Sequence, residues 1–177
     1  MVAVERLLTT DEVLRADPLF REYVDWGRDR LVTEFGVVWS DADVERMHDG
    51  FRAEWPKLIE DRGRIYLAVV DEIPAGVGAL KPLSATAAEV KRVFVRPHYR
   101  GQGIARTLMV RLLDDARSLG FETVRLDTMP FMTDAHRLYE SLGFVRTAPY
   151  DGEGLAIGLG LHAIYMEVSL GDLRSSR

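Results

Sequence analysis

The chain has 177 residues and a formal net charge of −5. Hydrophobic residues make up 47% of it and charged residues 29%, a composition and length typical of a globular protein with one core. The negative charge argues against a nucleic-acid binder, which usually has a basic face, and the absence of cysteine excludes disulfides, a thiolate zinc site and a cysteine nucleophile. No apolar run approaches the roughly 18 residues that span a membrane, and the N-terminus has no apolar signal core, so the default expectation is a cytoplasmic protein.

The first third of the chain is predicted to be mainly helical. A short strand is expected over residues 2–9, a helix from about 11 to 36, and a second helix from about 41 to 58. Pro18 breaks or starts the first helix, because proline fits the first turn of a helix and not its interior. Ser40 or Asp41 can cap the second helix, whose apolar residues recur at helical spacing.

From Arg64 onward the pattern changes to strands that alternate with helices. Strands are predicted over 64–70, 77–83, 87–95, 123–128, 144–150 and 161–170, and helices over 104–119 and 133–142. Residues 71–76 form the expected turn of an antiparallel hairpin, and Pro97 ends the third of these strands. This order of elements predicts a mixed α/β sheet in a single domain over residues 1–177.

The segment "RGQGIA" has Gly101 and Gly103 between a predicted strand and a predicted helix. A dinucleotide-binding fingerprint needs a third glycine where Arg106 stands, and a nucleoside-triphosphatase loop needs Gly-Lys-Ser/Thr, so both of these patterns fail. Two interpretations remain open at this point. One is a tight strand-to-helix turn without a ligand, which is common for short glycine pairs, and the other is a cradle for a pyrophosphate group.

A pyrophosphate cradle would combine several features of this segment. Residues without a Cβ let successive backbone N–H groups point into one concavity, and the helix from Ile104 adds its unsatisfied N–H groups and the positive end of its dipole. Arg100 and Arg106 flank the loop and can neutralise two negative charges. Each hydrogen bond to a charged group contributes roughly 1.5–3 kcal/mol, so several of them would anchor a phosphorylated cofactor without a large basic patch.

Two motifs carry a resemblance to a known family. "VRPHYRGQGIA", Val95 to Ala105, resembles the acetyl-CoA signature of the GNAT superfamily of N-acetyltransferases, and "AHRLYESLGF", Ala135 to Phe144, is similar to the second signature of that family. The motifs stand in the family's order and separation, and the match is close over roughly half of the chain. The resemblance implies a GNAT-type fold, in which a mostly antiparallel central sheet is splayed at the cofactor site and flanked by helices.

The resemblance also implies that acetyl-CoA is the cosubstrate. In the family, pantetheine pairs with the strand before the loop, and the pyrophosphate sits on the N–H groups of the loop. Carried over to this sequence, the cofactor-binding residues are Val93, Phe94, Val95, Arg100, Gly101, Gln102, Gly103, Ile104, Ala105 and Arg106. The N–H of Val93 is the candidate to hold the thioester oxygen and the oxyanion that develops from it. The four histidines show no metal-ligand spacing, so no metal is expected.

Tyr139 matches the tyrosine of the second signature, which in the family lies near the sulfur and protonates the departing thiolate. With unperturbed pKa values of about 8.5 for a thiol and 10 for a tyrosine, this transfer is feasible but weakly driven. Read from the residues alone, Tyr139 also fits a core position, since it shares an apolar face with Ala135 and Leu138. Many family members have asparagine where this chain has Met132, so no cofactor contact is carried over to that position.

The acceptor needs a base, because an amine with a pKa of about 10.4 is mostly protonated at pH 7 and costs about 4.6 kcal/mol to neutralise. The strand 87–95 contains Glu89, Lys91 and Arg92, and charges in a central strand need partners or a cavity. Glu89 stands four residues before Val93, where several family members have a catalytic glutamate. Two roles stay open: Glu89 is the base or orders the water that is, or Glu89 pairs with Lys91 and is structural.

The sequence therefore predicts an N-acetyltransferase that moves an acetyl group from acetyl-CoA to a primary amine by direct attack, with a small molecule or an amino acid as the favoured acceptor. Tyr23, Trp26 and Trp39 are candidates for the acceptor pocket, although each also fits the core. Residues 151–160 are expected to form a loop between the closing strands, and a second possible role for them is that of a lid over the substrate. The alternatives are a non-catalytic acyl-CoA-binding or sensing module and a protein lysine or N-terminal acetyltransferase. No nucleic-acid or membrane partner is expected, and a homodimer is left open.

Overall fold

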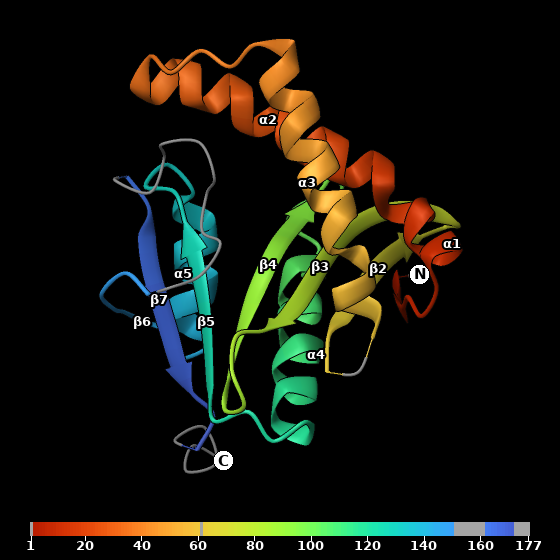
Figure 1. The fold of residues 1–177 in the computed structure, drawn as a ribbon, viewed down its shortest axis with the longest axis vertical. Helices are drawn as coiled ribbons and strands as arrows, with labels where there is room; N and C mark the ends of the chain where they lie inside the picture. Colours follow the sequence, from red (N-terminus) through yellow and green to blue (C-terminus); the bar gives the residue numbers. More distant parts are fainter. Residues whose placement is uncertain (1, 61, 151–161, 172–177) are drawn as a thin grey trace.

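The computed structural model describes residues 2–60, 62–150 and 162–171. Its strands are β1 (Val2–Arg6), β2 (Arg64–Val70), β3 (Ile73–Pro82), β4 (Ala87–Val95), β5 (Thr123–Thr128), β6 (Val145–Arg146) and β7 (Ile164–Ser169). They form one seven-stranded sheet in the order β1-β2-β3-β4-β5-β7-β6 (Figure 1). Neighbouring strands are antiparallel except β4 and β5, which are parallel. The predicted mixed and mostly antiparallel sheet is therefore confirmed.

Helices cover both faces of this sheet. They are α1 (Thr10–Val13), α2 (Asp17–Phe35), α3 (Asp41–Ile59), α4 (Ile104–Ser118) and α5 (Thr133–Ser141), with 3₁₀ turns η1 (Leu14–Ala16) and η2 (Pro97–Tyr99). Helices α2 and α3 lie on one face, and α4 and α5 lie on the other (Figure 1). Within the described ranges, no helix is long and apolar enough to cross a membrane.

The alternation of side chains along β2 divides the core into two layers. Ile65 and Leu67 belong to the layer that packs under α1, α2 and α3. Tyr66 and Ala68 belong to the layer that packs under α4 and α5. Successive side chains of a strand point to opposite faces, so a continuous apolar strand feeds both layers at once. The sheet is thus buried on both faces, so any gap between its strands lies between α1, α2 and α3 on one side and α4 and α5 on the other.

Several predicted boundaries differ from the structure. The first predicted helix is divided into α1, η1 and α2, and Pro18 stands in the first turn of α2, where its missing N–H costs nothing. β3 begins at Ile73 and not at Val77, because Asp71 and Glu72 adopt positive φ values of 49° and 68° and make the hairpin turn in two residues. The predicted strand 144–150 shrinks to the two residues of β6 at the edge of the sheet. The predicted loop 151–160 lies outside the described residues.

Strands β4 and β5 pair over a short distance and then separate. Their register runs only from Ala87 opposite Thr123 to Glu89 opposite Arg125. Figure 1 shows the two strands meeting at one end of the sheet and diverging towards α2 and α3. The second half of β4 therefore has a partner on one side only, which leaves a gap in the middle of the sheet. The splayed sheet expected from the sequence is present.

Candidate functional site

Two cavities open into the gap between β4 and β5. One has a volume of about 600 Å³ and is lined by the end of β4, the loop before α4, and α5; we call it the loop cavity. The other, of about 480 Å³, is lined by α2, α3, β4 and β5; we call it the helix cavity. Both are lined by Tyr23, Trp26, Val93, Phe131, Met132 and Tyr139. A molecule in one cavity would therefore adjoin a molecule in the other at Val93 and Tyr139.

The loop before α4 provides a row of backbone donors. Gly101 and Gly103 have φ values of 77° and 76°, in the left-handed region that favours glycine, and no atom lies within 4 Å of a Cβ added at either position. Gly103 is the N-cap of α4, and no side chain caps this helix end. Within the described chain, the backbone N–H groups of residues 101–106 make no hydrogen bond. These donors and the helix dipole fit a pyrophosphate group, and the open space leaves room for it.

Nine of the ten cofactor residues expected from the sequence line the loop cavity, and Gln102, which is exposed, does not. Arg100 is engaged within the protein. Its N–H donates to the carbonyl of Pro97 at 3.2 Å, and its Nε donates to the carbonyl of Val95 at 3.0 Å. Arg106 donates from Nη1 to Oγ of Ser141 at 2.9 Å, which joins α4 to α5. The donors available to a phosphate therefore begin at Gly101 and not at Arg100.

The lining of the loop cavity has an excess of positive charge. Arg30, Arg100 and Arg106 line it, and Asp134 is the one carboxylate among the described lining residues. The sequence does not single out Arg30, which lies on α2. Its guanidinium carbon is 5.1 Å from the centre of the Phe131 ring, and its Nη2 is 2.7 Å from Oε1 of Glu34. A phosphorylated ligand is the kind of molecule that this lining suits.

Tyr139 lies on α5 at the point where the two cavities meet. It is 5% exposed, and its ring packs 5.9 Å from that of Phe144. Burial raises the pKa of Tyr139 well above the usual value for tyrosine, so its hydroxyl stays protonated at any ordinary pH. Met132, which stands where the family often has asparagine, accepts a weak hydrogen bond at its sulfur from Oγ1 of Thr128 at 3.5 Å.

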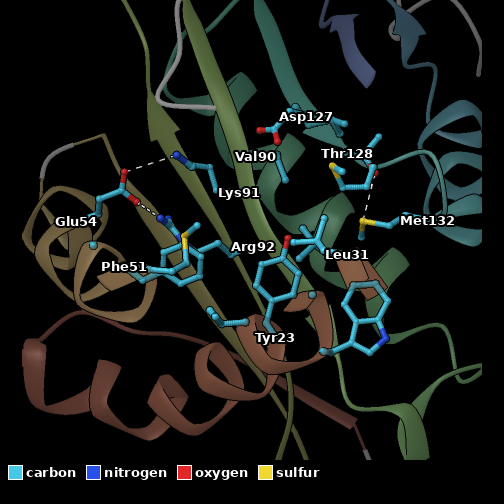
Figure 2. Close-up of a pocket in the computed structure, with 18 of the residues that line it drawn as sticks. Tyr23, Leu31, Phe51, Glu54, Val90, Lys91, Arg92, Asp127, Thr128 and Met132 are labelled. Atoms are coloured by element: carbon cyan, nitrogen blue, oxygen red, sulfur yellow. Dashed lines mark hydrogen bonds and ion pairs between the residues drawn. The ribbon is translucent and has the colours of Figure 1, made fainter. Parts of the chain in front are cut away.

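The helix cavity contains a cluster of charges on one side (Figure 2). Glu54 on α3 accepts a hydrogen bond at Oε1 from Lys81 at 3.0 Å, and Nζ of Lys91 lies 3.6 Å from the same oxygen. Arg92 pairs with Oε2 of Glu54 and stacks over the ring of Phe51, with 3.7 Å from the guanidinium carbon to the ring centre. The other walls are largely apolar and include Trp39, as well as Tyr23 and Trp26, so all three aromatic candidates line this cavity.

Glu89 is fully buried and lines neither cavity. Its Oε1 accepts a hydrogen bond from the hydroxyl of Tyr150 at 2.9 Å, and its Oε2 lies 3.5 Å from Nζ of Lys91. The ion pair that the sequence left open is therefore present. A base in this position would reach the acceptor only through another group.

Asp127 is the carboxylate of β5 that lines the helix cavity, on the side away from Glu54 (Figure 2). Burial raises the pKa of Asp127, and the negative charge of Glu89 raises it further, while Lys91 and Arg92 lower it by less. A carboxylate with a raised pKa that lies in a cavity is a candidate proton acceptor. Sequence reasoning missed Asp127. The one available signal was a carboxylate at the end of the strand "TVRLDT", on the far side of the predicted gap.

The sequence is similar to those of known proteins. Residues 24–144 match the model of the acetyltransferase (GNAT) family. The N-acetyltransferase YjgM of Escherichia coli, itself uncharacterized, is 35% identical over 121 residues, which are 64% of this chain and 66% of that protein. The L-amino acid N-acyltransferase MnaT of Escherichia coli is 32% identical over 80 residues, 45% of this chain and 46% of that protein. The chain spans between 29% and 66% of the length of the first curated relatives that it matches.

One solved structure shows the likeness of the fold. The PaiA N-acetyltransferase of Thermoplasma acidophilum, solved in complex with coenzyme A, superimposes with a TM-score of 0.68. The superposition covers 96% of this chain and 99% of the other, at 17% sequence identity. The overall fold is therefore shared, while the low identity carries no residue-level conclusion.

Proposed function

The chain belongs to the acetyltransferase (GNAT) family, and from this premise we propose that it transfers an acetyl group from acetyl-CoA to the primary amine of a small molecule or an amino acid. One observation carries the proposal: the loop cavity and the helix cavity meet at Val93 and Tyr139. A thioester held in the first cavity and an amine held in the second would be in contact there, which is the arrangement that direct attack requires. Both cavities belong to the same sheet, which supports the proposal of a single domain over residues 1–177.

Acetyl-CoA is the proposed occupant of the loop cavity. The N–H groups of residues 101–106 and the dipole of α4 would bind its pyrophosphate, and Arg106 and Arg30 would add positive charge. Pantetheine would lie along Val93, Phe94 and Val95, in the gap that β5 leaves beside β4. The Val95 carbonyl already accepts a hydrogen bond from Arg100, so this strand end offers fewer free groups than its lack of a β5 partner suggests.

The reaction needs an electrophile, a nucleophile and two proton transfers. The amine nitrogen bonds to the carbonyl carbon of the thioester, the carbon–sulfur bond breaks, the amine gives up a proton, and the sulfur gains one. The backbone N–H of Val93 is the proposed donor to the oxyanion. Tyr139 is the proposed hydrogen-bond donor to the departing thiolate; because burial raises its pKa, Tyr139 keeps its proton, and the thiolate takes its proton from water.

One carboxylate is the proposed base, and a second carboxylate raises its pKa. Asp127 lines the helix cavity, where the amine would be, so we propose that it receives the proton directly or through one water. Glu89 would act indirectly. Its charge raises the pKa of Asp127 and thereby makes Asp127 a better proton acceptor. This refines the expectation from the sequence, in which Glu89 was the base or ordered the water that is.

The helix cavity also favours a small acceptor over the alternatives. A non-catalytic acyl-CoA-binding module needs no second cavity of about 480 Å³ that adjoins the thioester. The walls of this cavity come from α2, α3, β4 and β5 and surround a volume that a small acceptor would fill. Its volume falls in the range of small-molecule sites, roughly 300–1,000 Å³.

Release of free CoA thiol from acetyl-CoA tests the proposed activity, with amines, amino acids, polyamines, aminoglycosides and peptides as acceptors. We expect turnover with at least one small primary amine and an equal amount of N-acetylated product by mass spectrometry. Tight binding of acetyl-CoA without turnover on any acceptor would instead support the binding module.

A further inference from the structure

Arg92 lies in the lining of the helix cavity with two of its guanidinium nitrogens unpaired. The side chain is 8% exposed, and Nη2 pairs with Glu54. Among the described residues, Nε and Nη1 have no hydrogen-bond partner. A guanidinium has five N–H donors and no acceptor, and donors that are buried without partners are unfavourable. Unpaired donors of this kind beside a cavity point to a ligand that brings acceptors.

The backbone turns Arg92 towards this cavity. Between β3 and β4 the register shifts, so that Ala79 faces Lys91 but Val77 faces Phe94. Arg92 stands at the resulting bulge with a φ of 56°, which is unusual for a residue other than glycine. Because of the bulge, Lys91 and its neighbour Arg92 both reach Glu54 and both line the helix cavity. A residue in such a conformation persists where the surrounding structure fixes it, and residues of this kind cluster at functional sites.

Arg92 is one of several cations that contact Glu54. Glu54 contacts Lys81 at 3.0 Å and Lys91 at 3.6 Å as well as Arg92. If a second carboxylate took Arg92, Glu54 would keep two cations, so no buried charge would lose all its partners. Glu54 thus occupies a position at Arg92 that another carboxylate can share or replace.

The charges and walls of the cavity agree with an anionic group on the ligand. The titratable side chains in its lining are the cations Arg46, Lys57, Lys91 and Arg92, the carboxylates Glu54 and Asp127, and the phenols of Tyr23 and Tyr139. Cations therefore outnumber carboxylates among the described lining residues. Leu31, Trp39, Met47 and Phe51 give the cavity apolar walls. A ligand with one carboxylate and an apolar body would match both features.

We propose that the acceptor is a primary amine that also carries a carboxylate, namely an amino acid with an apolar side chain, and that Arg92 binds this carboxylate with Lys91 beside it. The inference rests on the proposed acetyl transfer. Arg92 adjoins Val93 in the chain, so a carboxylate at Arg92 would leave the amine, a few bonds away, close to the thioester. Polyamines and aminoglycosides would add positive charge to a cationic lining and bind poorly.

L-Leucine and L-leucinamide, which differ only in the carboxylate, provide the first test. The amine of the amide has the lower pKa, near the value of about 7.7–8.0 for an α-amino group in peptides, so amine basicity favours the amide. We expect kcat/KM to be at least about 10-fold higher for leucine, the effect of one hydrogen bond to a charged group. Equal or faster acetylation of leucinamide would overturn the carboxylate site and leave the proposed acetyl transfer intact.

Variants connect this selectivity to Arg92. Arg92→Gln should lower kcat/KM for leucine at least about 10-fold more than it changes kcat/KM for leucinamide, and it should keep the affinity for acetyl-CoA. Arg46→Gln is the matched control, since Arg46 lines the same cavity but pairs with Asp43 at 2.7 Å; its leucine to leucinamide ratio should equal that of the wild type. Arg92→Lys is the second variant, in case Arg92→Gln does not fold. It keeps the positive charge and should retain part of the preference for leucine over leucinamide. A ratio that Arg92→Gln and Arg92→Lys both leave unchanged would contradict the role of Arg92.

A binding measurement separates this inference from the activity. N-Acetyl-L-leucine and N-acetyl-L-leucinamide are titrated calorimetrically into the wild type and Arg92→Gln in the presence of CoA. If the wild type binds N-acetyl-L-leucine but not the amide, and Arg92→Gln binds neither, the carboxylate site is supported. This holds even if no amine is acetylated, a result that would contradict only the proposed acetyl transfer. No preference for the acid in the wild type overturns the inference.

Discussion

The hydroxyl of Tyr150 donates a hydrogen bond of 2.9 Å to Oε1 of the fully buried Glu89. Burial and the charge of Glu89 raise the pKa of Tyr150, so this hydroxyl remains a donor at every pH at which the protein would be studied. With Lys91 at its other oxygen, Glu89 is held by two partners away from both cavities. The two carboxylates of the site are thus in different environments, and their variants should behave differently.

Asp127→Asn should lower kcat by about 10²–10⁴-fold, because it removes the proposed proton acceptor. Glu89→Gln should cost less. Since it removes a charge that raises the pKa of Asp127, the acidic limb of its pH–rate profile should move to lower pH. Full pH profiles of kcat/KM for both variants are the measurement. A larger loss in Glu89→Gln, with Asp127→Asn close to the wild type, would return the role of the base to Glu89.

Asp127→Asn should also make the protein more stable at neutral pH. The pKa of Asp127 is raised in the folded chain, so the folded state binds the proton more tightly than the unfolded state does. Stability is therefore lost as pH rises from the unfolded pKa, about 3.9, through the folded pKa, and the neutral Asn escapes this loss.

Thermal unfolding between pH 5 and pH 8 measures this effect. The Tm of Asp127→Asn should exceed that of the wild type at pH 8, and the difference should narrow as pH falls. Asp29→Asn is the control, since the Asp29 side chain is 81% exposed, and we expect its Tm to follow the wild type. A lower Tm for Asp127→Asn at pH 8 would argue that the Asp127 carboxylate is stabilised in the folded chain.

Tyr139→Phe should reduce kcat about 10²-fold or more while it leaves the Tm and the KM for acetyl-CoA nearly unchanged. The change removes the hydroxyl and keeps the ring that packs on Phe144. Steady-state kinetics with Tyr23→Phe as the control decide this prediction, because Tyr23 lines the same two cavities. If Tyr23→Phe lost more activity than Tyr139→Phe, the assignment of Tyr139 as the hydrogen-bond donor to the sulfur would be wrong.

Gly103→Ala should cost about 1–2 kcal/mol of stability and also weaken the binding of CoA. An added Cβ meets no atom within 4 Å, so the cost comes from the φ of 76°, which alanine adopts with strain. Gly120→Ala is a close control, since Gly120 has a φ of 79° and equally open surroundings but lines neither cavity.

Calorimetric titration with CoA and thermal unfolding are needed for both glycine variants. A similar fall in Tm is expected for the two, with weaker CoA binding in Gly103→Ala only. Unchanged CoA affinity in Gly103→Ala would show that the conformation of this loop does not matter to the cofactor.

Most residues of the loop cavity are close together in the sequence. The glycines, the N-terminus of α4 and the end of β4 follow each other directly in the chain, so their geometry depends on short-range backbone conformation. Gln102 was the exception: at the tip of the loop it is exposed and lines no cavity. Side-chain contacts such as that of Arg100 with Val95 depend on the folded loop and could not be read from the motif.

The helix cavity was harder to predict, because its residues come from distant segments. Asp127 joins this cavity only when β5 is in position, just as Arg30 joins the loop cavity only when α2 is in position. The bulge at Arg92 arises from the pairing with β3, although the sequence contained a sign of it. Two consecutive charges, Lys91 and Arg92, in a buried strand cannot both face a helix layer unless the alternation of side chains is broken.

A crystal structure with CoA joined through its acetyl group to the amine of leucine tests the central claim most directly. We predict that the pyrophosphate lies on the N–H groups of residues 101–106, that the acyl carbon lies between Val93 and Tyr139, and that the leucine carboxylate contacts Arg92. A ligand that bound with its pyrophosphate elsewhere, or with the leucine outside the helix cavity, would contradict the account.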